Sequence, residues 1–302
     1  MDKNKNQFTQ YLKAVGTGPK HNYDMTKEQI TDCFEMILSG EVSPEQIGAF
    51  LIAWRLKPET NDEFKAVVEL FNTKTTKQTV QNSCEIGYPY DGKRNNPYMF
   101  VSIAKMLLSF GINIVVTGDE LQPSKNGVTV KDIATNIVLP SNLYYFDRTK
   151  IFKSLSSLTS LRNNLGIRTG LNTIERLSNP ANSSVGITGV FHKPFMEKYK
   201  AMFENQYDKL VIIKGNEGTS EIYSKTLFWV IQNGKAVEQK IDPSRYGITY
   251  QKSWDNITLD ESLEMINNPT KEFLHIVRLN SALVLFIMNK ANSINEAYEK
   301  LI

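Results

Sequence analysis

Residues 209–215 read KLVIIKG, a short apolar run rich in β-branched residues that ends at a glycine. A similar run, GINIVV, occupies residues 111–116. Runs of this length and composition are typical of strands buried in a parallel sheet. Helical patterns lie around them, at residues 97–110, 151–165 and 192–206. This alternation predicts an α/β domain with a central, mostly parallel sheet.

The C-terminal part of the sequence extends this domain. LFWVIQNGKAVEQKI (227–241) places strand-like runs on both sides of Asn233-Gly234, a dipeptide that favours a tight hairpin turn. TLDESLEMI (258–266) and TKEFLHIVRLNSALVLFIMNKA (270–291) have helical patterns. We therefore expect an antiparallel hairpin followed by closing helices.

The first 75 or so residues have a helical pattern throughout. Three segments have a residue that can cap a helix at their first or second position, with Gln or Glu three positions after it. They are MTKEQITDCFEMILSG (25–40), SPEQIGAFLIAWRLK (43–57) and TNDEFKAVVELF (60–71). The sequence thus predicts a small all-helical N-terminal subdomain (residues 1–76) and a larger α/β domain (residues 77–302). The apolar helix faces need a partner, either the rest of the chain or a second copy.

Composition excludes few functions. The net charge is +3 and the sequence pI is about 8.6, which does not by itself indicate a nucleic-acid-binding protein. Residues 142–176 are more basic than the rest, so they can meet phosphates or form a solvated face. The cations of this region are Arg148, Lys150, Lys153, Arg162, Arg168 and Arg176.

Cysteine, histidine and hydropathy patterns indicate no metal site and no membrane span. Cys33 and Cys84 have no ligand neighbour at metal-binding spacing, so we expect reduced, buried thiols. No apolar run reaches the roughly 18 residues that a membrane span needs. The N-terminus has no signal-peptide pattern, and a cytoplasmic protein without a membrane partner is the prediction.

The stretch EIGYPYDGKRNNP (85–97) follows a short apolar lead-in and precedes a helical pattern. Gly87 and Gly92 bracket its core, and Asp91 lies beside the second glycine. A glycine-rich loop at the end of a strand can cradle a phosphate with its backbone N–H groups. Tyr88 and Tyr90, with the proline between them, occupy the positions where such a loop needs bare backbone.

Two further segments hold candidate ligand-binding residues. Arg162 and Arg168, in RNNLGIRT (162–169), can clamp a carboxylate or phosphate, or can fix the turn by binding backbone carbonyl groups. Glu217 and Glu221, in KGNEGTSEI (214–222), can hold Mg²⁺ through carboxylate oxygens, or can belong to a solvated loop.

EQIGAFLIAWRLKPET, RNNLGIRTGLNTIERLSNPA and GNEGTSE together resemble the anthranilate phosphoribosyltransferases of glycosyltransferase family 3. The resemblance covers nearly the whole chain. It implies the fold described above, of the nucleoside phosphorylase and phosphoribosyltransferase type, and a homodimer that forms through the helical subdomain. It also implies transfer of a phosphoribosyl group from PRPP to an amine, between the two domains.

Four motifs of the family are altered in this sequence. The phosphate loop GTGGDG keeps its outer glycines and its aspartate but has Tyr, Pro and Tyr between them, and proline lacks an N–H donor. N-x-S-T has become Pro97-Tyr98-Met99-Phe100. K-H-G-N-R has become Val116-Thr117-Gly118-Asp119-Glu120, and the Asp-Glu pair of the magnesium motif has become Ser220-Glu221. At about 1.5–3 kcal/mol for each charged hydrogen bond, these changes remove most of the affinity for PRPP.

The replacements resemble a divergent, YbiB-like branch of the family. That resemblance implies a protein that keeps the fold and the dimer, lacks the transferase activity, and binds nucleic acid nonspecifically through a basic groove. In this hypothesis Lys93, Arg94, Arg162, Arg168 and the cations of residues 148–153 contact phosphates. Tyr88 and Tyr90 either stack on bases or fill the space that the pyrophosphate has left.

Two alternatives stay open. In the first, the chain is an active glycosyl or phosphoribosyl transferase that uses PRPP and Mg²⁺ with an altered acceptor. Asp91, Glu217 and Glu221 then serve the metal, and Arg162 binds the acceptor carboxylate. In the second, the chain is a structural or regulatory dimer that binds neither ligand. No cofactor is expected outside the transferase alternative.

Overall fold

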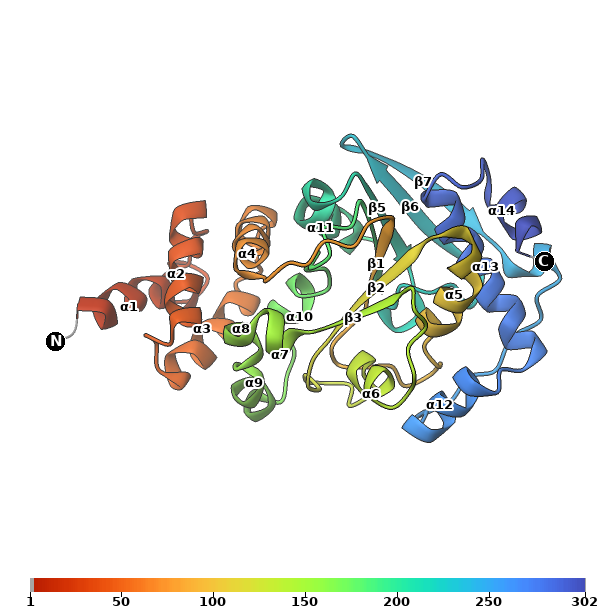
Figure 1. Cartoon of the computed structure of the whole chain (residues 1–302). Coiled ribbons are helices and arrows are strands. Elements are labelled where there is room, and N and C mark those ends of the chain that lie inside the picture. The colour runs from red at the N-terminus through yellow and green to blue at the C-terminus, as the bar shows by residue number, and fades with distance from the viewer. Residues whose placement is uncertain (1–2, 302) are drawn as a thin grey trace.

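A computed structural model describes residues 3–301. The N-terminal helices lie at one end of an elongated molecule and the C-terminal helices at the other (Figure 1). Thr26, Ser43 and Thr60 each accept a hydrogen bond from the backbone N–H three residues on, so the predicted caps are confirmed. The helices of this end are α1 (Lys3–Gly16), α2 (Lys27–Ser39), α3 (Pro44–Leu56) and α4 (Asn61–Lys74).

The predicted α/β domain is confirmed, with one mixed sheet in the order β3-β2-β1-β4-β5-β6-β7. The first five strands are parallel, and β6 and β7 form the predicted antiparallel hairpin. Chain order reverses between the neighbours β1 and β4, and crevices at such switch points bind ligands in α/β proteins. The strands are β1 (Ser83–Gly87), β2 (Asn113–Gly118), β3 (Leu143–Asp147), β4 (Val185–Val190), β5 (Lys209–Lys214), β6 (Thr226–Gln232) and β7 (Lys235–Ile241).

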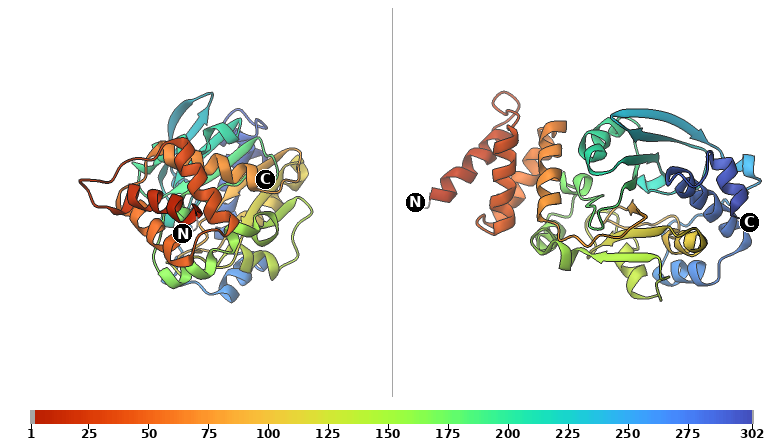
Figure 2. Two further views of the ribbon diagram at one scale, coloured as in Figure 1. Left: turned by 90° about the vertical axis from the view of Figure 1, so that its left-hand side faces the viewer. Right: turned by 45° about the horizontal axis from the view of Figure 1, so that its top comes forward.

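Helices cover both faces of the sheet (Figure 2). On β5, Val211 and Ile213 point to one hydrophobic core, and Leu210 and Ile212 point to the other, as strand alternation requires. The first core includes residues of α5 (Phe100–Leu107), α6 (Val130–Thr135), α12 (Leu259–Asn267), α13 (Lys271–Ile287) and α14 (Ile294–Lys300).

The second core includes residues of the N-terminal helices and of the helical segments between β3 and β5. These are α8 (Lys153–Ser156), α10 (Leu171–Ile174) and α11 (Phe195–Phe203), with α7 (Arg148–Ile151) and α9 (Thr159–Leu165) beside them. Short 3-10 turns complete the chain at η1 (Leu108–Phe110), η2 (Glu204–Gln206), η3 (Asn216–Gly218) and η4 (Pro243–Tyr246).

Three local expectations are corrected by the structure. The helical pattern at residues 151–165 forms separate short helices, because Phe152 has a non-helical backbone (φ −150°, ψ 65°). The patterns at 97–110 and 192–206 become α5 with η1 and α11 with η2. α1 lies in the region predicted to be helical but was not one of the three helices named there, and α6 and β3 were not predicted. β3 is a partly exposed edge strand without a continuous apolar run.

The two cysteines are free and buried, as expected. No helix among residues 3–301 has both the length and the apolar character needed to cross a membrane. The division of the chain at residue 76 stays a prediction.

The shared second core predicts cooperative unfolding of the N-terminal helices with the sheet. Phe71 of α4 packs edge-on against Phe152, with ring centroids 5.2 Å apart. Truncation of this buried ring in Phe71→Ala should therefore lower the free energy of unfolding by about 3–5 kcal/mol. In urea, tryptophan fluorescence and circular dichroism should still report one coincident transition. Separate transitions of the two probes would contradict this coupling.

Candidate functional site

The loop that follows β1 runs past the switch point between β1 and β4. Gly92 has φ +77°, and a Cβ there would collide with the backbone of Gly127. A Cβ at Gly87 would collide with the carbonyl oxygen of Arg176. These glycines therefore allow close approach of protein backbone, and Lys93 pairs with Val128 in an antiparallel bridge.

Glu221 lies buried under this loop and accepts hydrogen bonds from several of its groups. Its Oε1 accepts from the hydroxyl of Tyr88 at 2.8 Å and from the backbone N–H of Met99 at 2.6 Å. Its Oε2 forms an ion pair with Lys93, whose ammonium also donates to the hydroxyl of Tyr223 at 2.8 Å. Lys93 and Glu221 are each about 1% exposed in their side chains.

This cluster corrects the expectation that Lys93 meets phosphates at the outer edge of the loop. The lysine points inward because a buried carboxylate needs a cation. Burial lowers the pKa of Lys93, and Glu221 opposes that shift. Burial, with Glu221, raises the pKa of Tyr88 well above its usual value, so Tyr88 stays a neutral hydrogen-bond donor.

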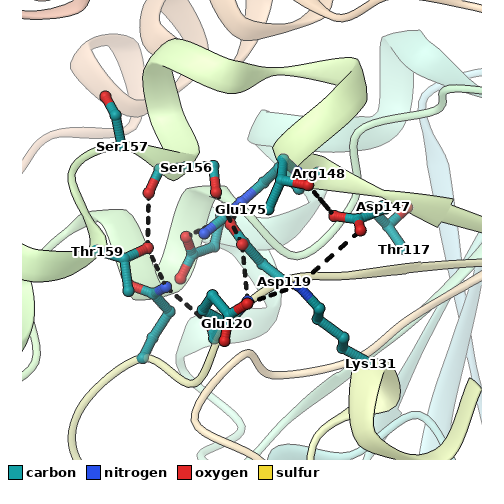
Figure 3. A network of polar contacts seen from close by, with 12 residues as sticks. Thr117, Asp119, Glu120, Lys131, Asp147, Arg148, Ser156, Ser157, Thr159 and Glu175 are labelled. Atoms are coloured by element: carbon teal, nitrogen blue, oxygen red, sulfur yellow. Dashed lines mark hydrogen bonds and ion pairs between the residues drawn. The ribbon is translucent and has the colours of Figure 1, made fainter. Parts of the chain in front are cut away.

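A second buried network lies under Tyr90, and Figure 3 shows its centre. Arg148 lies between Asp119 and Glu175, with its guanidinium carbon 4.1 Å from the centroid of the Tyr90 ring. Arg162 donates two hydrogen bonds to Glu175, at 2.7 and 2.8 Å. Arg162 is therefore a buried partner of Glu175 and is not available to bind a ligand. This corrects the hypothesis that Arg162 clamps a phosphate or an acceptor carboxylate.

The acids that replace the basic motif are thus matched by cations of the chain itself. Asp119 pairs with Arg148, and Glu120 pairs with Lys131 at 2.6 Å. Tyr88 and Tyr90 are 2% and 7% exposed, so their rings pack in the protein and cannot stack on bases in this conformation. Their burial agrees with the alternative in which the two rings fill space inside the protein.

The carboxylates proposed for Mg²⁺ are also engaged. Glu217 accepts the backbone N–H groups of Arg94 and Asn95, each at 3.0 Å, and Glu221 is held in the buried cluster. No group of three or more His, Cys, Asp or Glu side chains within residues 3–301 is arranged to hold a metal ion. In this conformation both carboxylates are held by protein groups, and the magnesium role that the transferase hypothesis gives them stays a prediction.

An open pocket of about 610 Å³ lies beside the closed loop, between the helical end and the carboxyl ends of β4 and β5. Asp91 is buried next to it and pairs with Arg168 at 2.7 Å and with Lys125 at 3.4 Å. Arg94 is exposed, with its Nε 3.0 Å from Asn256. The charged groups that line the pocket are Arg55, Arg94, Lys125, Arg168, Arg176, Glu217 and Asp255.

Of the predicted site residues, the pocket brings together Arg94, Arg168 and Glu217. Lys150 and Lys153 line a different pocket with Lys74, so the predicted track along residues 148–168 is not one groove.

Some pocket residues were not predicted. No local pattern in the sequence marks Lys125 or Arg55 as a pocket residue. The stretch VFH (190–192) was also missed, although its position at the carboxyl end of a strand is a signal for a ligand site.

Lys93 and Glu221 should be coupled strongly in stability. Lys93→Met leaves a buried carboxylate without a cation and should cost about 3–5 kcal/mol in the free energy of unfolding. The double variant Lys93→Met/Glu221→Gln should recover part of this loss, with a coupling energy of about 1–3 kcal/mol. The exposed neighbour gives the control, since Arg94→Met should change stability by no more than about 0.5 kcal/mol. An equally small effect of Lys93→Met on urea unfolding would mean that Lys93 faces water.

Glu175 should make the stability of the fold sensitive to acid. Burial alone would raise its pKa, but Arg162 and Arg148 outweigh burial and hold the pKa at about 2, below the usual 4.5. The stabilisation is complete above about pH 4.5 and disappears as the pH falls toward 2. Glu175→Gln should lose stability at neutral pH, on the order of 3 kcal/mol. Urea unfolding at several pH values should show this loss shrinking below pH 4.5, whereas a constant loss would contradict the assignment.

Comparison with known proteins supports the resemblance found in the sequence. Residues 9–71 match the helical bundle domain, and residues 129–302 the α/β domain, of a glycosyl transferase family. An uncharacterized protein of Aquifex aeolicus is 27% identical, with 90% of this chain and 91% of that protein covered. An anthranilate phosphoribosyltransferase of Caldicellulosiruptor saccharolyticus is also 27% identical, with 90% and 88% covered.

Solved structures of the same family have this fold. The anthranilate phosphoribosyltransferase of Thermus thermophilus superposes with a TM-score of 0.74 at 17% identity, covering 98% of this chain and 93% of the other. The enzyme of Saccharomyces cerevisiae in complex with PRPP and Mg superposes with a TM-score of 0.75 at 15% identity and the same coverage. Because the α/β-domain match alone spans more than half of the chain, this protein belongs to glycosyltransferase family 3, the family of the anthranilate phosphoribosyltransferases.

Proposed function

We propose that this chain has lost phosphoribosyl transfer and binds nucleic acid, without sequence preference, in the basic pocket beside the loop after β1. The observation that carries the proposal is the contrast between two neighbouring regions. The positions that hold phosphate in the family are filled by side chains that pair with each other. The cations of the adjacent pocket border an open space of about 610 Å³.

Several backbone donors in and after the loop that follows β1 are already engaged within the protein. Its backbone N–H groups at Lys93, Arg94 and Met99 donate to Val128, Glu217 and Glu221 of the protein. Pro89 has no N–H, and the buried rings on either side of it occupy the space above the backbone. Binding of PRPP here would require these hydrogen bonds to break.

The pocket cations come from distant parts of the chain. Arg55 lies in the last turn of α3, Arg94 follows β1, Lys125 belongs to the segment before α6, and Arg168 follows α9. The fold thus brings positive charge from the helical end and from loops of the α/β domain to one cleft. A cleft of this kind suits a chain of phosphates, and such binding depends strongly on salt because counterions are released.

Two features favour the transferase alternative. The pocket lies beside the switch point of the sheet, and the relatives include enzymes, one of them solved with PRPP and Mg. For that activity, Glu217 and Glu221 would have to give up their backbone and lysine partners to serve a metal.

The proposal also retains the homodimer and the YbiB-like branch that the sequence resemblance implies.

Oligonucleotide binding should depend on the exposed pocket arginines. The double variant Arg55→Ala/Arg94→Ala should bind a labelled single strand at least about tenfold more weakly at low salt, since charged hydrogen bonds contribute about 1.5–3 kcal/mol each. Fluorescence anisotropy at about 50 and 200 mM salt should show that affinity depends less on salt than in the unaltered protein. The slope of log K against log salt should fall by about 1 for each phosphate no longer neutralised. Lys235→Ala, an exposed cation on the remote β6–β7 hairpin, is the matched control and should bind normally.

Two results would overturn the proposal. One is the absence of binding by the unaltered protein to any oligonucleotide at low salt. The other is micromolar, Mg²⁺-dependent binding of PRPP in calorimetry, which would favour the transferase alternative.

A further inference from the structure

Phe191, His192 and Phe195 form an aromatic edge on the basic pocket, and the proposed function has not used them. All three line the pocket. Phe191 is 58% exposed and Phe195 is 41% exposed, although large apolar side chains are usually buried. Exposed aromatic rings beside cations are the arrangement with which proteins bind unpaired bases.

The backbone fixes these rings at the ligand-binding edge of the sheet. Val190 is the last residue of β4, and its carbonyl accepts the N–H of Gly215 at 3.0 Å. Phe191 follows directly, and a Cβ added at Gly218, which has φ +70°, would be in ordinary contact with the backbone nitrogen of Phe191, at 3.5 Å. The N–H of Phe195 donates to the carbonyl of His192 at 3.0 Å, so a tight turn connects the two phenylalanines.

The rings have cationic neighbours in the same pocket. Arg176 is 5% exposed, and its guanidinium donates to the carbonyl of Gly218 at 2.6 Å. Its buried Nε has no hydrogen-bond partner among the described residues. Phosphates held by the arginines would place the attached bases within reach of the rings.

We propose that Phe191 and Phe195 are a stacking platform that makes this pocket prefer single-stranded nucleic acid to duplex. The inference rests on the proposed function and adds the form of its ligand. Bases in a duplex are stacked on each other and do not offer their faces to a protein side chain. An unpaired strand offers both its phosphates to the arginines and its bases to the two rings. Any base can stack, so the platform adds no sequence preference.

The test separates base contacts from phosphate contacts. The probes are a thymidine strand of about 16 nucleotides, an abasic strand of the same length and a duplex of the same length. The unaltered protein should bind the thymidine strand at least about fivefold more tightly than the abasic strand or the duplex. Phe191→Ala and Phe195→Ala should each remove most of this difference and leave binding of the abasic strand unchanged.

Conservative variants distinguish stacking from packing. Phe191→Tyr keeps an aromatic face and should bind like the unaltered protein, whereas Phe191→Leu keeps apolar bulk and should bind like Phe191→Ala. Val237→Ala, at an exposed apolar residue of the remote hairpin, should have no effect. Equal binding of the thymidine and abasic strands by the unaltered protein would overturn the platform but leave the proposed function standing. Failure to bind any of the probes would overturn both.

Discussion

The carboxylate of Glu221 holds the loop after β1 in its closed form. It is almost fully buried, and it gathers the hydroxyl of Tyr88, the ammonium of Lys93 and the backbone N–H of Met99. A buried charge without these partners would be strongly destabilising, so the loop and the carboxylate constrain each other. This constraint also shapes the neighbouring pocket. Lys93 points into the protein, and the next residue, Arg94, is exposed and lines the pocket.

The pairing of carboxylates with cations of the same chain also occurs at the two residues that follow β2. Asp119 and Glu120 follow β2, and each has a cation of the chain as its partner, Arg148 and Lys131 respectively. The protein thus supplies its own counter-charges at these positions. This pairing supports the proposal that the region no longer binds a polyanion.

Local features of the sequence were sufficient to predict the fold class, although not the helix α6 or the edge strand β3. Thr26 and Thr60 mark helix starts through short-range capping, and the run at residues 209–215 has the composition of a buried strand. The roles of Lys93 and Arg162 could not be predicted in this way. Their partners Glu221 and Glu175 lie 128 and 13 positions away, and only the folded chain shows that all four are buried. The aromatic edge at Phe191 was missed because two phenylalanines near a strand end usually belong to a core.

Nucleic acid should bind in the pocket while the loop after β1 keeps the form seen here, with Lys93 paired to Glu221. A crystal structure of the protein with a short thymidine oligonucleotide would decide whether it does. Phosphates should lie against Arg55, Arg94 and Arg168, and the ion pair between Lys93 and Glu221 should be intact. Phosphates bound to the backbone of residues 88–92, with that ion pair broken and the loop opened, would show instead that the loop still serves as a phosphate cradle.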